Sequence, residues 1–112
     1  MVTPQVDIIV PVLNDLRILE TIKSVRHFDD IDGVRLVIMA ATSSEDFLEN
    51  VRPALMPHDI LNTEPDNGIF DALNKGLDLC TAPIMGWLGA DDIFTGQIRA
   101  SDMVRDFTAT DK

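Results

Sequence analysis

The chain contains four short apolar runs, and their recurrence constrains the fold more than any other feature. The runs are rich in aliphatic and β-branched residues and cover Val6–Val12, Val34–Ala40, Asp59–Thr63 and Pro83–Leu88. Runs of this length are typical of strands that are buried on both faces, as in a parallel sheet. Trp87 lies in the last run, so we expect its side chain to pack in the core.

The segments between these runs have the spacing of amphipathic helices. Within residues 67–80, apolar or small residues recur at intervals of three and four and form one stripe: Ile69, Ala72, Leu73, Gly76, Leu77 and Cys80. A similar stripe after the first run comprises Leu16, Leu19, Ile22 and Val25. Ser43 or Ser44 can cap a third helix that stops near Pro53. A weaker pattern predicts a last helix over Thr95–Asp106.

Strands that alternate with helices predict βαβ units and therefore an α/β fold. We expect a doubly wound, mostly parallel four-stranded sheet that is flanked by helices. The 112 residues suit one domain over positions 1–112, with one hydrophobic core.

The chain is strongly acidic, with 9 Lys and Arg against 19 Asp and Glu, a net charge of −10. Phosphate neutralisation needs clustered Lys and Arg, so we exclude nucleic acid as a partner. No apolar run approaches the roughly 20 residues that span a bilayer, and the first residues lack the basic start of a signal peptide. We therefore expect a cytoplasmic protein. The single Cys80 excludes an intrachain disulfide, and we expect a buried, unreactive thiol.

Polar residues follow all four predicted strands. In open α/β sheets, ligands bind beyond the carboxyl ends of the strands, so these exits are candidate site segments. They are Asn14 and Asp15, residues 41–46, residues 64–68, and Asp91 with Asp92. Polar loops are also ordinary, so this pattern alone leaves both interpretations open.

The adjacent carboxylates Asp91 and Asp92 are the sharpest chemical feature. In a turn both can approach one ligand, and Mg²⁺ or Mn²⁺ favours one or two carboxylates together with phosphate oxygens. The alternative is that they cap the following helix. Lys75 also has two interpretations, an ion pair with Asp71 one helical turn earlier or a contact with an anionic nucleotide.

Three segments resemble family 2 glycosyltransferases, which have the GT-A fold. Ile8–Asp15 resembles that family's IIVPVYNE start, Glu64–Gly76 is similar to its EPDxGIYDAMNKG segment, and Pro83–Phe94 is similar to the strand before its DXD-type motif. The matches occur in family order and cover about Asp7–Phe94. The resemblance implies a glycosyltransferase-like protein with a truncated GT-A-like fold, of which this chain covers the nucleotide-binding half.

The resemblance also implies roles for particular residues. It places six residues against the nucleotide of a UDP-sugar or similar donor: Pro11, Val12, Asn14, Asp66, Lys75 and Asp91. Asp92, together with Asp91, would hold Mg²⁺ or Mn²⁺ across the diphosphate. Such a metal neutralises the leaving diphosphate, so the bond to the anomeric carbon breaks more easily. The implied acceptor is an unknown saccharide or lipid.

The sequence departs from the family pattern in two places. The family usually has an aspartate directly after the second strand that reads uracil, but here Ala40 or Ala41 occupies that place, so weak uridine binding or another base is possible. Family members also continue into an acceptor-binding half that supplies the catalytic base. Asp102 and Asp106 lie in the corresponding part of the chain, yet nothing marks either as the base, so the catalytic residues stay unassigned.

These observations leave several functional hypotheses. The first is a small glycosyltransferase, and the second is a degenerate nucleotide-sugar-binding or assembly module. A receiver-like signalling domain fits poorly, because that fold places its acidic pair after the first strand. A sheet without the acceptor half would expose apolar surface near Pro83–Leu88, so we expect a homodimer or larger oligomer.

Overall fold

The computed structural model describes residues 4–41, 43–92 and 99–110, with the side chains of 106–110 excluded. Strands and helices alternate along the chain. In order they are β1 (Val6–Pro11), α1 (Ile18–Phe28), β2 (Val34–Met39), α2 (Glu45–Val51), the 3₁₀ turn η1 (Arg52–Ala54), β3 (Ile60–Asn62), α3 (Ile69–Leu79), β4 (Ile84–Trp87) and α4 (Ala100–Thr110).

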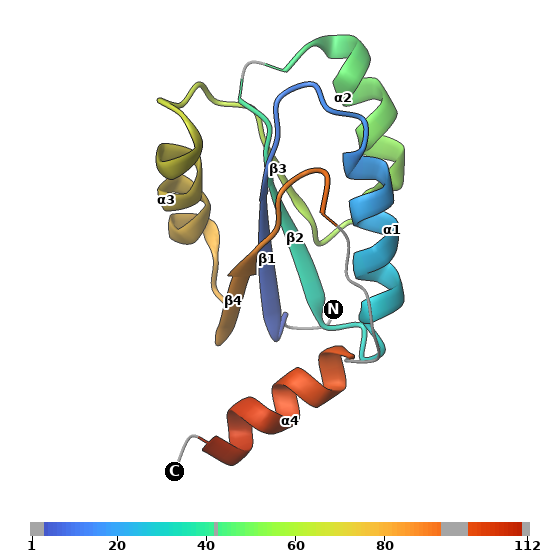
Figure 1. Cartoon of the computed structure of the whole chain (residues 1–112), viewed down its shortest axis with the longest axis vertical. Helices are drawn as coiled ribbons and strands as arrows, with labels where there is room; N and C mark the ends of the chain where they lie inside the picture. The colour runs from blue at the N-terminus through green and yellow to red at the C-terminus, as the bar shows by residue number, and fades with distance from the viewer. Residues whose placement is uncertain (1–3, 42, 93–98, 111–112) are drawn as a thin grey trace.

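The four strands form one parallel sheet in the order β3-β2-β1-β4. Val6 of β1 lies opposite Val34 of β2 and Ile84 of β4, which fixes the register of the centre. α1 and α2 cover one face of the sheet and α3 covers the other (Figure 1). The predicted α/β class and the doubly wound, parallel four-stranded sheet are therefore confirmed. Strand order reverses at β1, the position where such sheets bind ligands.

The two central strands alternate between two apolar layers because successive side chains point to opposite faces. Ile8 and Leu36 belong to the larger cluster under α1 and α2, whereas Ile9 and Val37 pack against Ala72 of α3. Both faces of these strands are buried, which explains why the two runs have few polar residues.

Asp7 in β1 is a fully buried carboxylate. It accepts hydrogen bonds from Arg35 Nε (2.8 Å) and Nη2 (3.0 Å), and from the backbone N–H groups of Thr81 (2.8 Å) and Ala82 (2.9 Å). Burial by itself raises the pKa of Asp7, but the hydrogen bonds from Arg35, Ala82 and Thr81 together lower it below its ordinary value. The chain entering β4 is thereby tied to the two central strands.

A second buried carboxylate, Asp59, organises the entry to β3. Its oxygens accept hydrogen bonds from the backbone N–H groups of Leu36 (2.9 Å) and Met56 (2.8 Å), and its charge is balanced by Arg26 of α1. These two acidic residues are thus structural, and because each is paired with an arginine, the pairing leaves the net charge of −10 unchanged.

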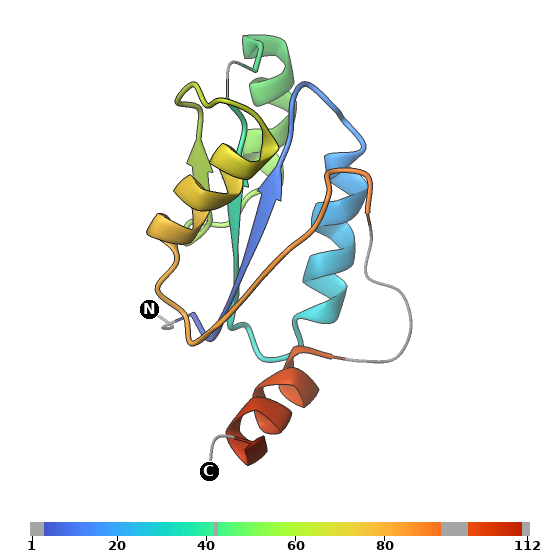
Figure 2. The same cartoon turned by 60° about the vertical axis from the view of Figure 1, so that its left-hand side comes forward.

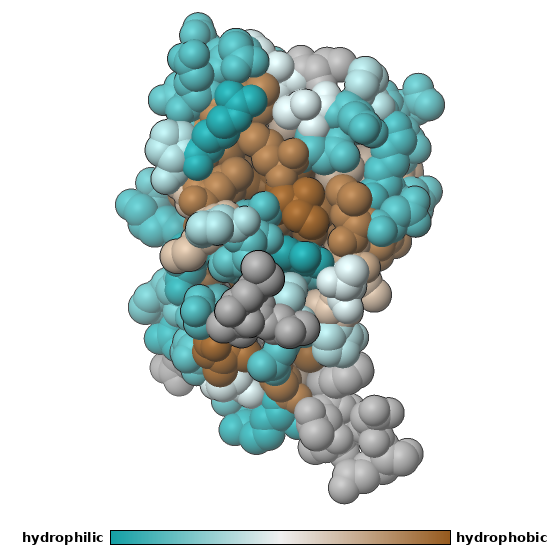
Figure 3. All heavy atoms as spheres, turned by 180° about the vertical axis from the view of Figure 1, so that it is seen from behind, coloured by the Kyte–Doolittle hydropathy of each residue, from teal (hydrophilic) through white to brown (hydrophobic). Residues whose placement is uncertain are grey.

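The outer strands are less buried than predicted. β4 alternates half-buried and exposed residues, and Trp87 is 57% exposed, so the expected core position of Trp87 is wrong. β3 has three residues, all half-buried. Each outer strand has a paired neighbour on one side only within the described segments, so its other side lacks cover. From behind, where β3 is outermost, hydrophobic side chains reach the surface between polar flanks (Figure 3).

The stripe predicted on α3 is only partly buried. Ala72 and Gly76 face the sheet, whereas Ile69 is 51% and Leu77 is 48% exposed. On the side toward β4 an apolar hollow of about 350 Å³, here called the β4 hollow, is lined by Ile9, Phe70, Leu73, Asn74, Leu77, Met85, Gly86 and Trp87. Cys80 is half-buried, less than the full burial expected, and burial followed by the charge of Asp7 raises the pKa of its thiol.

The bounds and buried faces of the other helices can also be compared with the predictions from the sequence. α1 begins at Ile18, so Leu16 precedes the helix and is exposed; the buried face comprises Ile18, Thr21, Ile22, Val25 and Phe28. Ser44 caps α2, as predicted, because its Oγ accepts the N–H of Phe47 at 3.2 Å. Across the described residues, no helix combines the length and apolar character needed to cross a bilayer.

Candidate functional site

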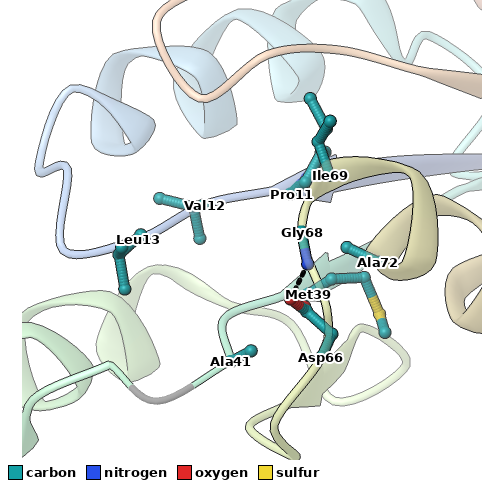
Figure 4. Close-up of a pocket in the computed structure, with 9 residues that line it drawn as sticks. All are labelled: Pro11, Val12, Leu13, Met39, Ala41, Asp66, Gly68, Ile69 and Ala72. Atoms are coloured by element: carbon teal, nitrogen blue, oxygen red, sulfur yellow. Dashed lines mark hydrogen bonds between the residues drawn. The ribbon is translucent and has the colours of Figure 1, made fainter.

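A pocket of about 440 Å³, here called the α3 pocket, opens at the carboxyl end of the sheet (Figure 4). Its walls come from the end of β1, the end of β2, and the loop and first turn of α3. The lining residues are Pro11, Val12, Leu13, Met39, Ala41, Asp66, Gly68, Ile69 and Ala72. Asp66 is the only ionisable side chain among these residues. The pocket therefore offers apolar walls for a flat ring and one carboxylate to accept hydrogen bonds from it.

The loop before α3 is held by acceptors within its own segment. Asp66 Oδ1 accepts the N–H of Gly68 at 3.1 Å, which the dashed line in Figure 4 marks, and Asp71 Oδ2 accepts the N–H of Asn67 at 2.8 Å. Gly68 has a φ of 107°, a backbone conformation that residues with a side chain rarely adopt, so a glycine suits this position. The backbone N–H of Asn67 lowers the pKa of Asp71, so its carboxylate is ionised at neutral pH.

Lys75 braces the same loop. Its Nζ donates a hydrogen bond to the carbonyl oxygen of Pro65 at 2.7 Å and lies 3.3 Å from Asp71 Oδ2. The ion pair proposed from the sequence is thus present. Lys75 does not line the α3 pocket, and its contact with a nucleotide stays a prediction.

The β1–α1 loop (residues 12–17) connects the pocket to the neighbouring strand exits. Leu13 lines the α3 pocket, and Asn14 Oδ1 accepts the N–H of Ser44 at 2.8 Å. Asn14 has a φ of 51°, which asparagine tolerates better than most residues. Asn14 therefore shapes the loop without lining the pocket, and its nucleotide contact also stays a prediction.

The β4 exit turn, Gly89–Asp92, brings the two adjacent carboxylates together. The N–H of Asp92 donates to the carbonyl of Gly89 (3.0 Å), and Asp92 Oδ2 accepts the N–H of Gly89 (2.9 Å). A β-carbon at position 89 would lie 2.9 Å from Asp92 Oδ2 and 3.2 Å from Asp91 Oδ1. Both carboxylates converge on the space that this missing side chain leaves, a geometry in which they can approach one ligand.

Thr21 fixes the β4 exit turn against α1. Its buried hydroxyl lies 2.8 Å from the carbonyl oxygen of Ala90 and 2.5 Å from that of Asp92, and donates to this pair. A polar side chain on the core-facing side of α1 is thus explained by a contact nearly seventy residues away in the sequence. Thr21 cannot be recognised from the sequence, because its partners are backbone atoms of another element.

Arg17 is a second residue that the sequence patterns do not reveal. Its Nε and Nη2 donate to the carboxylate of Asp15 at 2.8–3.2 Å, and its Nη1 lies 3.7 Å from Asp91 Oδ2. The hydrogen bonds from Arg17 lower the pKa of Asp15. A guanidinium group therefore stands beside the two carboxylates of the exit turn.

The β4 exit turn suits a divalent cation that shares its coordination sphere with a substrate. Mg²⁺ and Mn²⁺ take oxygen ligands, usually one or two carboxylates with phosphates and water. In the segments that the structure describes, no three His, Cys, Asp or Glu side chains group closely enough to hold an ion. A cation here would therefore complete its coordination with water or with oxygens from a bound ligand.

The structure brings some of the predicted residues together and separates others. Pro11, Val12 and Asp66 line one pocket, whereas Asp91 lies near Arg17 and Asp92 contacts Thr21 of α1. Both places belong to the carboxyl edge of the sheet.

α4 lies at the other end of the molecule (Figure 2). Ser101 donates to Asp30 in the loop that enters β2, from its N–H (2.8 Å) and its hydroxyl (2.5 Å). Asp102 accepts the N–H of Arg99 at 3.1 Å, and its helix, α4, lies at the other end of the molecule from the β4 exit turn (Figure 2). The side chain of Asp106 and residues 93–98, which include the start of the predicted last helix, lie outside the described residues.

Comparison with known proteins gives a family match over almost the whole chain. The model of "Glycosyl transferase family 2" matches residues 7–112. Relatives named "PGL/p-HBAD biosynthesis glycosyltransferase" from Mycobacterium bovis (strain BCG / Pasteur 1173P2) and Mycobacterium tuberculosis (strain ATCC 25177 / H37Ra) are 29% identical over 119 residues. The match covers 93% of this chain and 46% of each relative, so the chain spans about half the length of these proteins.

A solved structure shares the fold. It is a mannosyltransferase from Pyrobaculum calidifontis in complex with GDP-Man and Mn²⁺. The TM-score is 0.65 at 22% sequence identity, and the match covers 85% of this chain and 30% of that one. At this identity the likeness is informative about the arrangement of strands and helices alone.

Proposed function

Because this chain belongs to glycosyl transferase family 2, we propose that it binds a nucleoside diphosphate sugar as the donor for glycosyl transfer. The GT-A-like fold predicted from the sequence is confirmed by the mannosyltransferase likeness. The observation that carries the proposal is the pairing of a ring-sized apolar pocket with a turn of two convergent carboxylates at one edge of the sheet.

The α3 pocket is the proposed site of the base. Its apolar walls can stack on a ring, and Asp66 can accept a hydrogen bond from a ring N–H. Ala40 or Ala41 stands where the family usually carries an aspartate, and Ala41 lines the pocket, so base recognition would depend on Asp66. The UDP-sugar expected from the sequence stays a prediction, and GDP-Man in the mannosyltransferase structure makes a guanine nucleotide the second donor to test.

The β4 exit turn is the proposed site of a divalent cation. Asp91 and Asp92 would share Mg²⁺ or Mn²⁺ with the two phosphates of the donor. The cation would stabilise the negative charge that develops on the leaving diphosphate. The mannosyltransferase with the same fold was solved with Mn²⁺, which supports this choice of ion.

Isothermal titration calorimetry with UDP and GDP, with and without Mn²⁺, tests both halves of the site. Asp92→Asn is expected to remove the Mn²⁺-dependent part of binding, with Asp46→Asn, an exposed acid on α2, as its control. Ile69→Ala is expected to weaken nucleotide binding whether or not Mn²⁺ is present. Leu77→Ala is the matched control, because Leu77 lies on the same helix with similar exposure (48% against 51%) and lines the β4 hollow instead.

Three results would contradict parts of the proposal. Absence of binding to either nucleotide with Mn²⁺ would remove the donor site. Equal loss in Ile69→Ala and Leu77→Ala would show that the α3 pocket is not where the base lies. Unchanged Mn²⁺ dependence in Asp92→Asn would remove the cation role of that residue.

A binding or assembly module without independent transfer activity is the second candidate. It is favoured by the position of Asp102, the described carboxylate in the last helix, which lies at the opposite end of the sheet from the exit turn. A general base must come within hydrogen-bond reach of the acceptor hydroxyl. Donor binding without release of UDP or GDP in the presence of saccharide or lipid acceptors would favour this candidate. The cytoplasmic location stays a prediction, as does self-association through the surface around β4.

A further inference from the structure

We infer that Arg17 stands in for a divalent cation beside Asp91 in the unliganded protein, and turns to the diphosphate when cation and donor bind. The inference rests on the proposed function, because it requires that both ligands bind at the β4 exit turn. It adds Arg17, the residue immediately before α1, to a site otherwise built from the β4 exit turn.

The position of Arg17 is set by the packing of the turn on α1. Thr21 binds the backbone of the turn through the carbonyl oxygens of Ala90 and Asp92. Arg17 precedes Thr21 by one helical turn, and residues at this spacing lie on the same side of a helix. The contact at Thr21 therefore places the guanidinium group beside Asp91, 3.7 Å from its Oδ2.

The guanidinium group is held firmly on one side and loosely on the other. Nε and Nη2 form hydrogen bonds with Asp15, whereas the distance from Nη1 to Asp91 is too long for a hydrogen bond. The side chains of Arg17 and Asp91 are 69% and 53% exposed. Water competes for such an exposed pair, so a divalent cation can take Asp91 at little cost.

The charges at the turn explain why this exchange would serve a diphosphate donor. Asp15, Asp91 and Asp92 are three negative groups, and among the described residues Arg17 is the cation that pairs with the first two. A divalent ion bound at Asp91 would repel Arg17. The planar guanidinium group of Arg17 can then pair with phosphate oxygens, for which its geometry is well suited.

Arg17→Met separates this role from simple pairing with Asp15. It removes the competing charge, so Mn²⁺ alone should bind about fivefold tighter, as followed by electron paramagnetic resonance of free Mn²⁺. It also removes a phosphate partner, so UDP or GDP with Mn²⁺ should bind about tenfold more weakly by calorimetry. Uridine and guanosine, which lack phosphates, should bind as they do to the wild type. Arg52→Met, which breaks the exposed pair with Glu45 on α2, is the control and should change none of these affinities.

Tighter binding of Mn²⁺ together with weaker binding of the nucleoside diphosphate in Arg17→Met would support the inference. A residue that only supports the loop would weaken nucleotide, nucleoside and Mn²⁺ binding together, and that outcome would overturn the inference. Equal Mn²⁺ affinity in the two proteins, including no measurable binding by either, would also overturn it. If the wild type binds no nucleoside diphosphate with Mn²⁺, the proposed function fails as well; if it binds one and Arg17→Met binds it equally, only the role of Arg17 fails.

Discussion

Asp7→Asn is expected to lower the free energy of unfolding by about 3 kcal/mol. The change keeps the size of a fully buried side chain but removes its charge and replaces one acceptor oxygen by an amide donor. That amide would face one of the four donors now satisfied if it replaces Oδ1, and three if it replaces Oδ2, which accepts from Arg35 Nη2 and from the N–H groups of Thr81 and Ala82. Breaking a buried ion pair costs about 3–5 kcal/mol because the other charge loses its partner. The side chain of Arg35 is 14% exposed and also binds the hydroxyl of Thr81, so we take the lower end.

Urea unfolding followed by far-ultraviolet circular dichroism measures this loss. With a slope of about 2 kcal/mol per molar urea, the midpoint should fall by about 1.5 M. Asp78→Asn, at an exposed position of α3, should leave the midpoint unchanged. The combined change Asp7→Val with Arg35→Met leaves no unpaired charge and should be more stable than Asp7→Asn alone. A fall of less than about 0.5 M in Asp7→Asn, or a combined variant less stable than it, would refute the reasoning.

Three further outcomes are expected. Gly76→Val should lower the free energy of unfolding by about 2 kcal/mol, because a β-carbon there would lie 2.7 Å from a methyl group of Ile9; Gly86→Val, with open space around its β-carbon, should be neutral in the same urea titration. The pKa of Asp7 lies below its ordinary 3.8, so the contribution of its charge to stability is complete above that pH and is lost as the pH falls further. The thermal unfolding midpoint of the wild type should therefore decrease as the pH is lowered from 3.8, and the midpoint of Asp7→Asn should decrease less. Gly89→Ala should weaken Mn²⁺-dependent nucleotide binding about tenfold in calorimetry with an unchanged far-ultraviolet spectrum, because its methyl group would displace both carboxylates.

The parts of the fold that follow from local periodicity could be predicted from the sequence. The two central strands are recognisable because both of their faces are buried, so β1 and β2 have few polar interruptions. An outer strand such as β4 has a similar composition, and only the structure shows that β4 lies at the edge of the sheet, where Trp87 is 57% exposed. The buried face of α1 differs from the predicted stripe because it includes Thr21. This residue is polar, and its hydroxyl donates to the backbone of another element.

The candidate site depends more on tertiary contacts than the fold does. Pro11, Val12 and Asp66 were reached through a resemblance in local motifs, and the structure places them around one pocket. Ile69 completes that pocket from a position that the helical stripe assigned to the core. Arg17 could not be singled out, because its proximity to Asp91 depends on how the β4 exit turn packs on α1.

The β1–α1 loop has a consequence for how two ligands would influence each other. Leu13 touches whatever fills the α3 pocket, and Asp15 orients the guanidinium group beside the exit turn a few positions later. A nucleoside in the α3 pocket that displaces the loop would therefore change the free energy of ion binding at the β4 exit turn, and an ion at the turn would change the free energy of nucleoside binding. Thermodynamic reciprocity then requires that the factor by which a nucleoside changes the affinity for the ion equals the factor by which the ion changes the affinity for the nucleoside.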